Sequence, residues 1–344
     1  MAVRAFITGL AGLEISANER AFLREAQPWG LILFKRNISS PDQVTALARS
    51  FRDIVGREAP VLVDQEGGRV QRLGPPHWPA YPPGARYGDL YDRDPESGLM
   101  AARLGAHLIA SDLRAVGIDT DCLPLADVPV PGSDNVIGDR AYGTEPGKVA
   151  AIAGAVADGL LAGGVLPVLK HLPGHGRAAA DSHLKLPVVD TDRATLEQTD
   201  FAAFRLLAGL PLGMTAHVVF SAIDPVQPAT TSVTIVDRVI RGFIGFRGLL
   251  MSDDVSMGAL SGSLAERSRA ALAAGCDVVL HCNGDLGEMM QVASATPALE
   301  GEGARRAEAA LLRRSAPDEF DVAEARLMFN ALTGRPAAQA MAKS

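Results

Sequence analysis

Cysteine is scarce in this chain of 344 residues, which contains only three, at positions 122, 276 and 282. An odd number of cysteines, in a chain long enough to bury a large core, argues against a fold held together by disulfide bonds. We therefore expect all three side chains to be buried thiols, as is usual for unpaired cysteine. Such cysteine usage suits a reducing compartment.

An excess of positive charge is also missing, because the net charge is −7 and the isoelectric point is near 5.5. The chain therefore lacks the basic field that holds nucleic acid or an anionic membrane surface. It has no apolar run of about 18 residues that could cross a bilayer. The apolar start, residues 1–10, lacks the charged beginning and long apolar middle of a signal peptide, and predicts a first strand. We expect a soluble, cytoplasmic protein that binds neither membranes nor nucleic acid.

A glycine-rich phosphate loop is absent as well. Residues Thr8-Gly-Leu-Ala-Gly12 follow the first apolar run, but they lack the G-x-G-x-x-G spacing of dinucleotide-binding folds. No cofactor is indicated. Because nothing resembles a linker or a second compact unit, we expect one domain over residues 1–344, with helices between Arg305 and Leu332 completing its outer layer.

Short apolar runs rich in β-branched residues recur along the chain, and most are separated by segments with helical periodicity. Ser40, Asp94 and Ser263 are good capping residues that open three of these helices. Strands that alternate with helices imply parallel pairing through right-handed crossovers. Eight such units predict an α/β protein with a (β/α)8 TIM-type barrel. The expected strands lie near residues 5–9, 30–34, 60–64, 119–125, 166–171, 213–219, 248–253 and 277–282.

Three of the predicted strands end in polar residues that are suited to chemistry. Asp64 follows one apolar run, Lys170 and His171 end a second, and Asp253 ends a third. In an α/β barrel the C-terminal ends of the strands meet on one face, where active sites are built. The sequence therefore predicts an enzyme in which these side chains lie close together.

Asp253 alone is open to two interpretations, because an acidic residue at a strand end can face a ligand or cap the next helix. Asp254 is ambiguous in the same way. Successive residues of a strand point to opposite sides, so we expect only one of these two carboxylates to face the pocket. The same argument predicts that Lys170 and His171 point in different directions.

The connection from His171 to a helix beginning near Thr195 is long and rich in glycine, proline, histidine and alanine. Long loops of this kind inside compact domains tend to be functional. Asp181 lies two residues before His183, so its carboxylate can orient the imidazole and stabilise its protonated form. This spacing indicates acid/base chemistry on the loop.

A metal site is the alternative for this loop, with His171, His175 and His183 as ligands beside Asp181. Pro173-Gly174 lies between the first two histidines, so they cannot share a helical face as the zinc-binding H-E-x-x-H pair does. We therefore expect no metal.

Arg72 and Arg140 fit a mixed array of charges with Asp64 and Lys170, which is typical of sites that recognise sugar hydroxyl groups. Taken alone, each arginine is more often part of a surface ion pair.

Several of these residues belong to segments that occur in a fixed order, and together they resemble the bacterial β-N-acetylglucosaminidases of glycoside hydrolase family 3. The likeness runs from the first strand to about residue 285 and is greatest for the short, single-domain, cytoplasmic branch. The segments are Asp64-Gln-Glu-Gly-Gly-Arg-Val-Gln-Arg72, Asp134-Asn-Val-Ile-Gly-Asp-Arg-Ala-Tyr-Gly143, Lys170-His-Leu-Pro-Gly-His-Gly176, Asp181-Ser-His183 and Ser252-Asp-Asp-Val-Ser-Met257.

The resemblance implies a retaining hydrolase in which Asp253 is the nucleophile and His183, with Asp181, is the acid/base. It also implies that the N-acetylglucosamine unit is bound by Asp64, Arg72, Arg140, Lys170 and His171. The implied substrates are small molecules from peptidoglycan recycling, N-acetylglucosaminyl-anhydromuropeptides, and we expect a monomer. Leu172 stands where phenylalanine is common in the family, and Arg177 falls in its variable stretch.

The sequence is also compatible with three other functions. A family-related β-glucosidase or a phosphorylase would use the same covalent intermediate. A barrel lyase or aldolase would need Lys170 as a Schiff-base amine with a depressed pKa, and would leave Asp253 without a role. A sugar-binding protein without activity is disfavoured because Asp253, Asp181 and His183 are all present.

Overall fold

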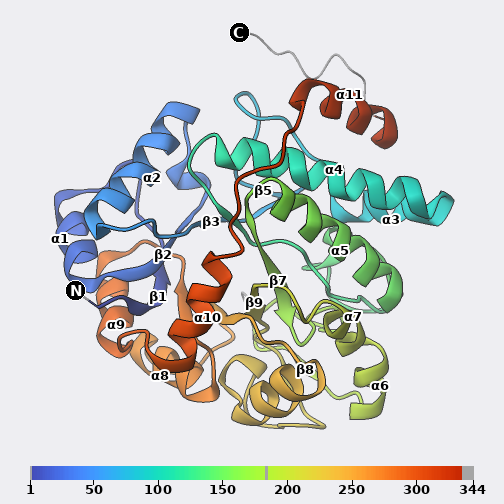
Figure 1. Cartoon of the computed structure of the whole chain (residues 1–344). Helices are drawn as coiled ribbons and strands as arrows, with labels where there is room; N and C mark the ends of the chain where they lie inside the picture. The colour runs from blue at the N-terminus through green and yellow to red at the C-terminus, as the bar shows by residue number, and fades with distance from the viewer. Residues whose placement is uncertain (1, 183–184, 335–344) are drawn as a thin grey trace.

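The computed structural model describes residues 2–182 and 185–334. Within this part of the chain, eight parallel strands close into a barrel in the order β1, β2, β3, β6, β7, β9, β11 and β12 (Figure 1). This confirms the predicted (β/α)8 fold. The barrel strands are β1 (Arg4–Thr8), β2 (Pro28–Leu33), β3 (Val61–Val63), β6 (Thr120–Asp121), β7 (Leu166–Leu172), β9 (Leu212–Thr215), β11 (Leu249–Asp254) and β12 (Val278–His281).

Helices lie around the barrel and begin where the capping residues predict. Ser40 accepts a hydrogen bond from the Gln43 amide at the start of α2, and Ser263 forms a full capping box at the start of α8. The helices are α1 (Ala17–Ala26), α2 (Pro41–Val55), α3 (Gly84–Arg93), α4 (Pro95–Arg114), α5 (Pro146–Ala162), α6 (Arg193–Gln198), α7 (Asp200–Leu206), α8 (Leu264–Ala274), α9 (Leu286–Ala295), α10 (Gly301–Leu311) and α11 (Val322–Thr333), with a π-helix at Ile235–Phe243. Within the described ranges, no helix combines the length and apolar character needed to cross a membrane.

Two of the predicted strands are shorter than expected. The run at 119–125 forms β6 over two residues only, because Pro124 has no amide hydrogen to continue the ladder. Leu125 then makes an isolated bridge to Lys170. The run at 213–219 leaves the barrel after Thr215, and its last residue joins β10 (Val219–Phe220), which pairs with β8 (Val188–Val189) outside the barrel.

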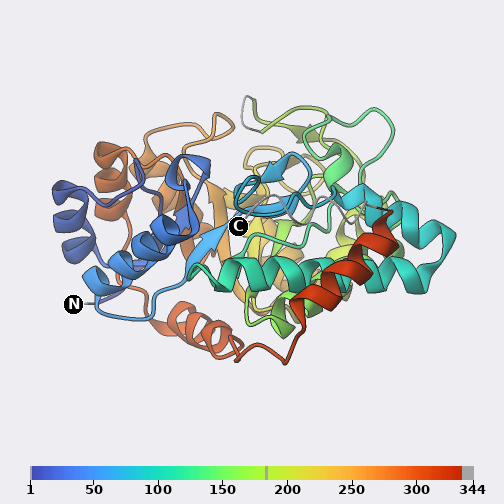
Figure 2. The ribbon, with the colours of Figure 1, turned by 90° about the horizontal axis from the view of Figure 1, so that it is seen from above.

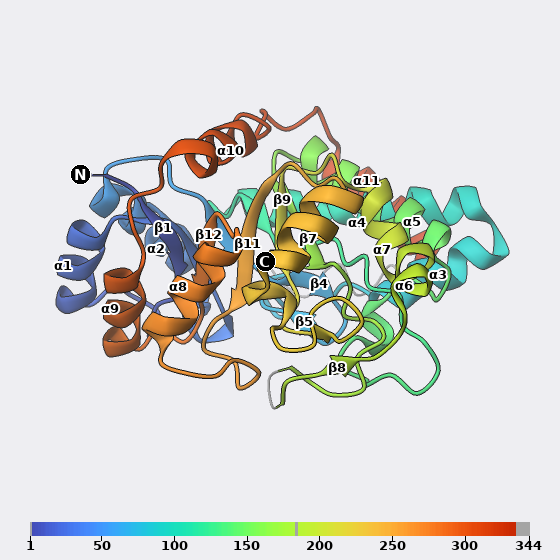
Figure 3. The ribbon, with the colours of Figure 1, turned by 90° about the horizontal axis from the view of Figure 1, so that it is seen from below.

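The two ends of the barrel differ in what covers them. The hairpin of β4 (Gln65–Gly67) and β5 (Val70–Gln71) lies with β8 at one end, and α10 lies at the other (Figure 3). Ala307 and Ala310 of α10 belong to the same buried cluster as Ile7, Val168 and Met251 of the barrel strands. Apolar contacts therefore close the α10 end and leave the hairpin end for polar groups.

The segment from Arg305 to Leu332 contains two helices, α10 and α11, which are separated by residues 312–321 and lie in different places. While α10 covers the barrel end, α11 lies across α4 (Figure 2). Phe329 of α11 is buried against the rings of Tyr81 and Tyr87. The aromatic contacts attach α11 firmly to the rest of the fold.

Candidate functional site

The C-terminal ends of the barrel strands surround a cavity of about 440 Å³. Asp64 follows β3, Lys170 and His171 lie in β7, and Asp253 lies in β11, and all four line this cavity. Parallel strands bring their ends to one face, so these residues meet as the sequence predicts. Asp254 at the end of β11 and Glu66 of the β4–β5 hairpin also line it, together with Phe34, Arg72, Arg140 and Asp181 from the segments that follow the strands.

Five charged side chains form a continuous series of ion pairs along one wall. The Lys170 Nζ atom lies 2.9 Å from Asp64 Oδ1 and 2.7 Å from Glu66 Oε1. Arg72 Nη2 lies 2.9 Å from Asp64 Oδ2, and Arg140 donates two hydrogen bonds of 2.8 Å to Glu66. Each carboxylate is thus held between the lysine and one arginine, which fixes its orientation toward the cavity.

The charges of this wall are stable at neutral pH. Burial alone would lower the pKa of Lys170, but Asp64 and Glu66 outweigh burial and raise it. Burial also opposes ionisation of these two carboxylates, and again the ion pairs prevail, so the pKa of Asp64 and that of Glu66 are lowered. A Schiff-base lysine needs a depressed pKa, so the environment of Lys170 argues against a lyase or aldolase.

His171 is oriented by a carboxylate that the sequence did not single out. Asp127 is completely buried, and its Oδ2 atom lies 2.7 Å from His171 Nδ1. Burial works against the ionised form, but His171 lowers the pKa of Asp127, so the group stays a carboxylate. As an acceptor it keeps the proton on Nδ1 and leaves Nε2 of His171 for a ligand in the cavity.

The expected alternation of side chains fails at both strand ends. Lys170 and His171 line the same cavity, and so do Asp253 and Asp254. The pairing of β7 with β9 shifts register between Leu169 and Leu172, so the regular pleat is interrupted there. A similar shift interrupts β11 between Met251 and Asp254. The peptide bond between Lys170 and His171 is cis.

The two neighbouring carboxylates of β11 have different surroundings. Asp254 accepts hydrogen bonds from the Ser256 amide, the Ser256 hydroxyl and the Cys282 amide, at 3.0, 2.6 and 3.2 Å. It therefore organises the loop that follows β11. Asp253 accepts the Asp254 amide at 2.8 Å through Oδ1, and its own amide lies 3.4 Å from Thr215 Oγ1. Both carboxylates line the cavity, and the three bonds to Asp254 fix its orientation toward the following loop.

The long loop after β7 brings Asp181 to the same cavity, while His183 lies outside the described residues. Near its start the loop is attached by Arg177, which makes a two-pronged ion pair with buried Asp200, its Nη2 atom lying 2.8 Å from Oδ2. Farther along, Ser182 Oγ lies 3.0 Å from His175 Nε2. These contacts hold Asp181 against the barrel.

Glu66 and Asp127 are the site residues that sequence reasoning missed. A weak signal existed for Glu66, because it lies two residues after Asp64 in a segment that pairs as a strand, so both can face one side. Asp127 follows the irregular segment after β6, and its contact with His171 depends on the tertiary fold.

The prediction that all three cysteines are buried thiols is confirmed for two of them. Cys122 and Cys276 are buried thiols, but Cys282 is partly exposed because it lines the cavity mouth, so the prediction was wrong for it. His217 is fully buried and bonds Thr230 and the Asp254 carbonyl. Within residues 2–182 and 185–334, no three His, Cys, Asp or Glu side chains are grouped to hold a metal ion.

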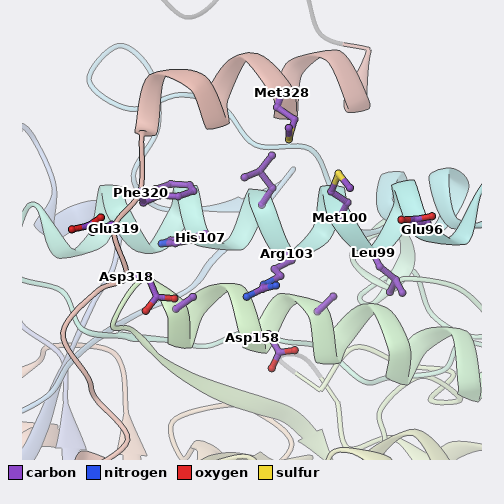
Figure 4. Close-up of a pocket in the computed structure, with 13 residues that line it drawn as sticks. Glu96, Leu99, Met100, Arg103, His107, Asp158, Asp318, Glu319, Phe320 and Met328 are labelled. Carbon is purple, nitrogen blue, oxygen red and sulfur yellow. The ribbon is translucent and has the colours of Figure 1, made fainter.

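A second cavity, of about 570 Å³, lies outside the barrel between α4, α5, α11 and the segment that precedes α11 (Figure 4). Met100, Phe320 and Met328 give it an apolar wall, and the His107 ring stacks on Phe320 at 3.6 Å. The His107 side chain of α4 is therefore packed against the segment that precedes α11. None of the side chains that line this cavity is among the predicted site residues, so we place the candidate site in the barrel.

Comparisons with known proteins show which family this chain resembles. The model of the glycosyl hydrolase family 3 N terminal domain matches residues 3–311. A beta-hexosaminidase from Alkalilimnicola ehrlichii is 43% identical over 291 residues, which cover 82% of this chain and 82% of that protein. A beta-hexosaminidase from Xylella fastidiosa is 41% identical over 285 residues, covering 81% of this chain and 84% of that one.

The chain also resembles solved structures over most of its length. NagZ from Neisseria gonorrhoeae, in complex with N-trifluoroacetyl-D-glucosamine, has a TM-score of 0.85 and 29% identity and covers 99% of both chains. A glycoside hydrolase family 3 beta-N-acetylglucosaminidase from Paenibacillus sp. has the same TM-score and identity, and covers 95% of this chain and 66% of that one.

Proposed function

We propose that this chain, which belongs to glycosyl hydrolase family 3 and is a glycoside hydrolase, acts as a retaining exo-β-N-acetylglucosaminidase. One observation carries the proposal: Asp253 faces the same cavity as the ion-paired wall of Asp64, Glu66 and Lys170. A carboxylate nucleophile beside fixed charges that bind hydroxyl groups is the arrangement that glycoside cleavage needs.

In the first step, protonated His183 donates its proton to the glycosidic oxygen while an Asp253 oxygen attacks the anomeric carbon. The bond from that carbon to the glycosidic oxygen breaks, and the aglycone leaves as an alcohol. The sugar is then joined to Asp253 by an ester bond, and His183 is neutral.

In the second step, His183 takes a proton from a water molecule whose oxygen attacks the anomeric carbon. The ester bond breaks, which releases the sugar and restores the Asp253 carboxylate. Two successive inversions at one carbon return the β configuration. Asp181 stabilises the protonated form of His183, which exists before the first step and again after the second.

We assign sugar binding to Asp64, Arg72, Arg140, Lys170 and His171. Lys170 and the arginines donate to hydroxyl or carbonyl oxygens, and Asp64 accepts from hydroxyl groups. His171 offers Nε2, because Asp127 holds its other nitrogen. Glu66 joins this group through its bonds to Lys170 and Arg140, which set the position of both cations.

The biological substrates in this proposal are N-acetylglucosaminyl-anhydromuropeptides released during peptidoglycan recycling in the cytoplasm. Removal of the terminal non-reducing sugar fits a cavity that is closed at its floor by barrel side chains. We further propose that residues 1–344 form one domain that works as a monomer. The amino-sugar ligand of the Neisseria gonorrhoeae NagZ structure supports the choice of sugar.

The proposal is tested by hydrolysis of the 4-nitrophenyl β-glycosides of N-acetylglucosamine and of glucose, with a chelator and without added metal. We expect release of nitrophenol from the N-acetylglucosaminide only, at a rate that the chelator does not change. Cleavage of the glucoside would move the substrate away from peptidoglycan. Loss of activity with the chelator would revive the metal alternative, and no cleavage of either compound would contradict the proposed function.

A further inference from the structure

A buried hydrogen bond joins the loop that carries Asp181 to the barrel. His175 Nε2 and Ser182 Oγ lie 3.0 Å apart, and the two residues are 3% and 2% exposed. Burial and the neighbouring His171 lower the pKa of His175 to about 4, so its ring is neutral at neutral pH. A neutral imidazole and a hydroxyl group can each donate or accept, so the bond costs no buried charge.

His175 itself is held in place by the barrel end. Its amide donates a hydrogen bond of 2.7 Å to Asp127, the carboxylate that also holds His171. The next residue, Gly176, lies so close to Val128 that a Cβ atom would come within 2.3 Å of the Val128 backbone. The His175 side of the bond therefore cannot follow the loop if the loop moves.

Ser182 is the residue between Asp181 and His183. Neighbouring Cα atoms are about 3.8 Å apart across a trans peptide bond, so holding the Ser182 side chain restricts the position of Asp181. Asp181, which precedes it, lines the cavity. The hydroxyl group of Ser182 is aimed the other way, into the protein, because its partner is buried.

We propose that Ser182 is a positioning residue, whose hydrogen bond to His175 holds the acid/base segment at the cavity. This inference rests on the proposed function. Without the bond, the segment spends less time in the position from which a proton reaches the glycosidic oxygen. Cleavage that depends on protonation slows, whereas binding of the sugar by Asp64 and Lys170 does not change.

The test compares Ser182→Ala with Ser182→Thr, which keeps the hydroxyl group, and with Lys185→Ala, an exposed control on the same loop. Values of kcat/KM are measured for a methyl or alkyl N-acetylglucosaminide, whose departure needs a proton, and for the 2,4-dinitrophenyl glycoside, whose departure does not. Loss of one neutral hydrogen bond should reduce the first value roughly fivefold to tenfold and leave the second within about twofold. Ser182→Thr should restore most of the loss, and Lys185→Ala should behave as the wild type.

A second pair of variants keeps the inference falsifiable if Ser182→Ala folds poorly. His175→Phe removes the partner atom, and the double variant His175→Phe/Ser182→Ala should be no slower than the slower single variant. Equal losses on both substrates, fully additive losses, or no loss in Ser182→Ala would overturn the positioning role. Failure of the wild type to cleave either compound would instead contradict the proposed function and remove the basis of this inference.

Discussion

Acidification should destabilise the wild-type protein more than a variant that lacks the His175 imidazole. The ring lies buried between the barrel and the loop, and its pKa falls from the ordinary 6.5 to about 4. As the pH drops through this window, the unfolded chain binds a proton on this histidine that the folded chain does not bind. The contribution of the neutral ring to the free energy of unfolding is therefore fully present above pH 6.5 and is lost as the pH falls from 6.5 to about 4.

The expected loss is large enough to measure. A histidine with a pKa of 6.5 in the unfolded chain and about 4 in the fold accounts for about 3 kcal/mol of unfolding free energy. Whole domains have about 5–15 kcal/mol, so this one group changes a substantial fraction of the total.

Urea unfolding, followed by the fluorescence of the two tryptophans, gives the free energy of unfolding at about pH 7.5, 6, 5 and 4. His175→Phe is the matched control, since its ring fills similar space but cannot bind a proton. The hydrogen bond that this variant loses adds an offset that does not depend on pH. Carboxylates titrate in both proteins, so their effect cancels in the difference. The advantage of the wild type should shrink by about 3 kcal/mol, and a constant advantage would refute the buried, neutral state of His175.

Further predictions concern the cavity itself. Asp253→Ala should keep the fold and lose turnover, which circular dichroism and a nitrophenol assay check together. His183→Ala should slow substrates with poor leaving groups far more than the 2,4-dinitrophenyl glycoside, and equal rates on the former would exclude the acid/base role. Lys170→Met should weaken binding of N-acetylglucosamine in calorimetry by roughly tenfold to a hundredfold, because a charged hydrogen-bond donor is lost. Asp127→Asn should lower kcat/KM by a similar factor, because the amide no longer keeps the proton on Nδ1 of His171, and an unchanged value would show that the tautomer does not matter.

The positions of the site residues along the chain could be predicted because barrel topology is simple. Once Asp64, Lys170 and Asp253 are recognised at the ends of parallel strands, the fold alone brings them together. The sides of the strands to which these side chains point could not be predicted in the same way. The pleat is interrupted after Leu169 and after Met251, and these register shifts arise from pairing between strands distant in sequence.

The supporting residues were harder to find than those facing the cavity. Asp127 acts through a bond of 2.7 Å to a histidine 44 positions away, and no spacing rule links the two residues. Glu66 was not singled out from the sequence because Asp64, two residues earlier, was already an adequate ion-pair partner for Lys170. Local sequence patterns identify the segments that carry charged residues, while the tertiary fold decides which of these residues form ion pairs with one another.

If Asp253 is the nucleophile, it forms a covalent bond to the sugar that can be trapped and detected. A 5-fluorinated N-acetylglucosaminyl fluoride slows both chemical steps, because fluorine disfavours positive charge on the ring, while the fluoride leaving group restores the first step. Mass spectrometry of the digested protein should then find the added sugar on Asp253. A label on Asp64 or Asp254, or an α-configured product without any label, would show that Asp253 is not the nucleophile.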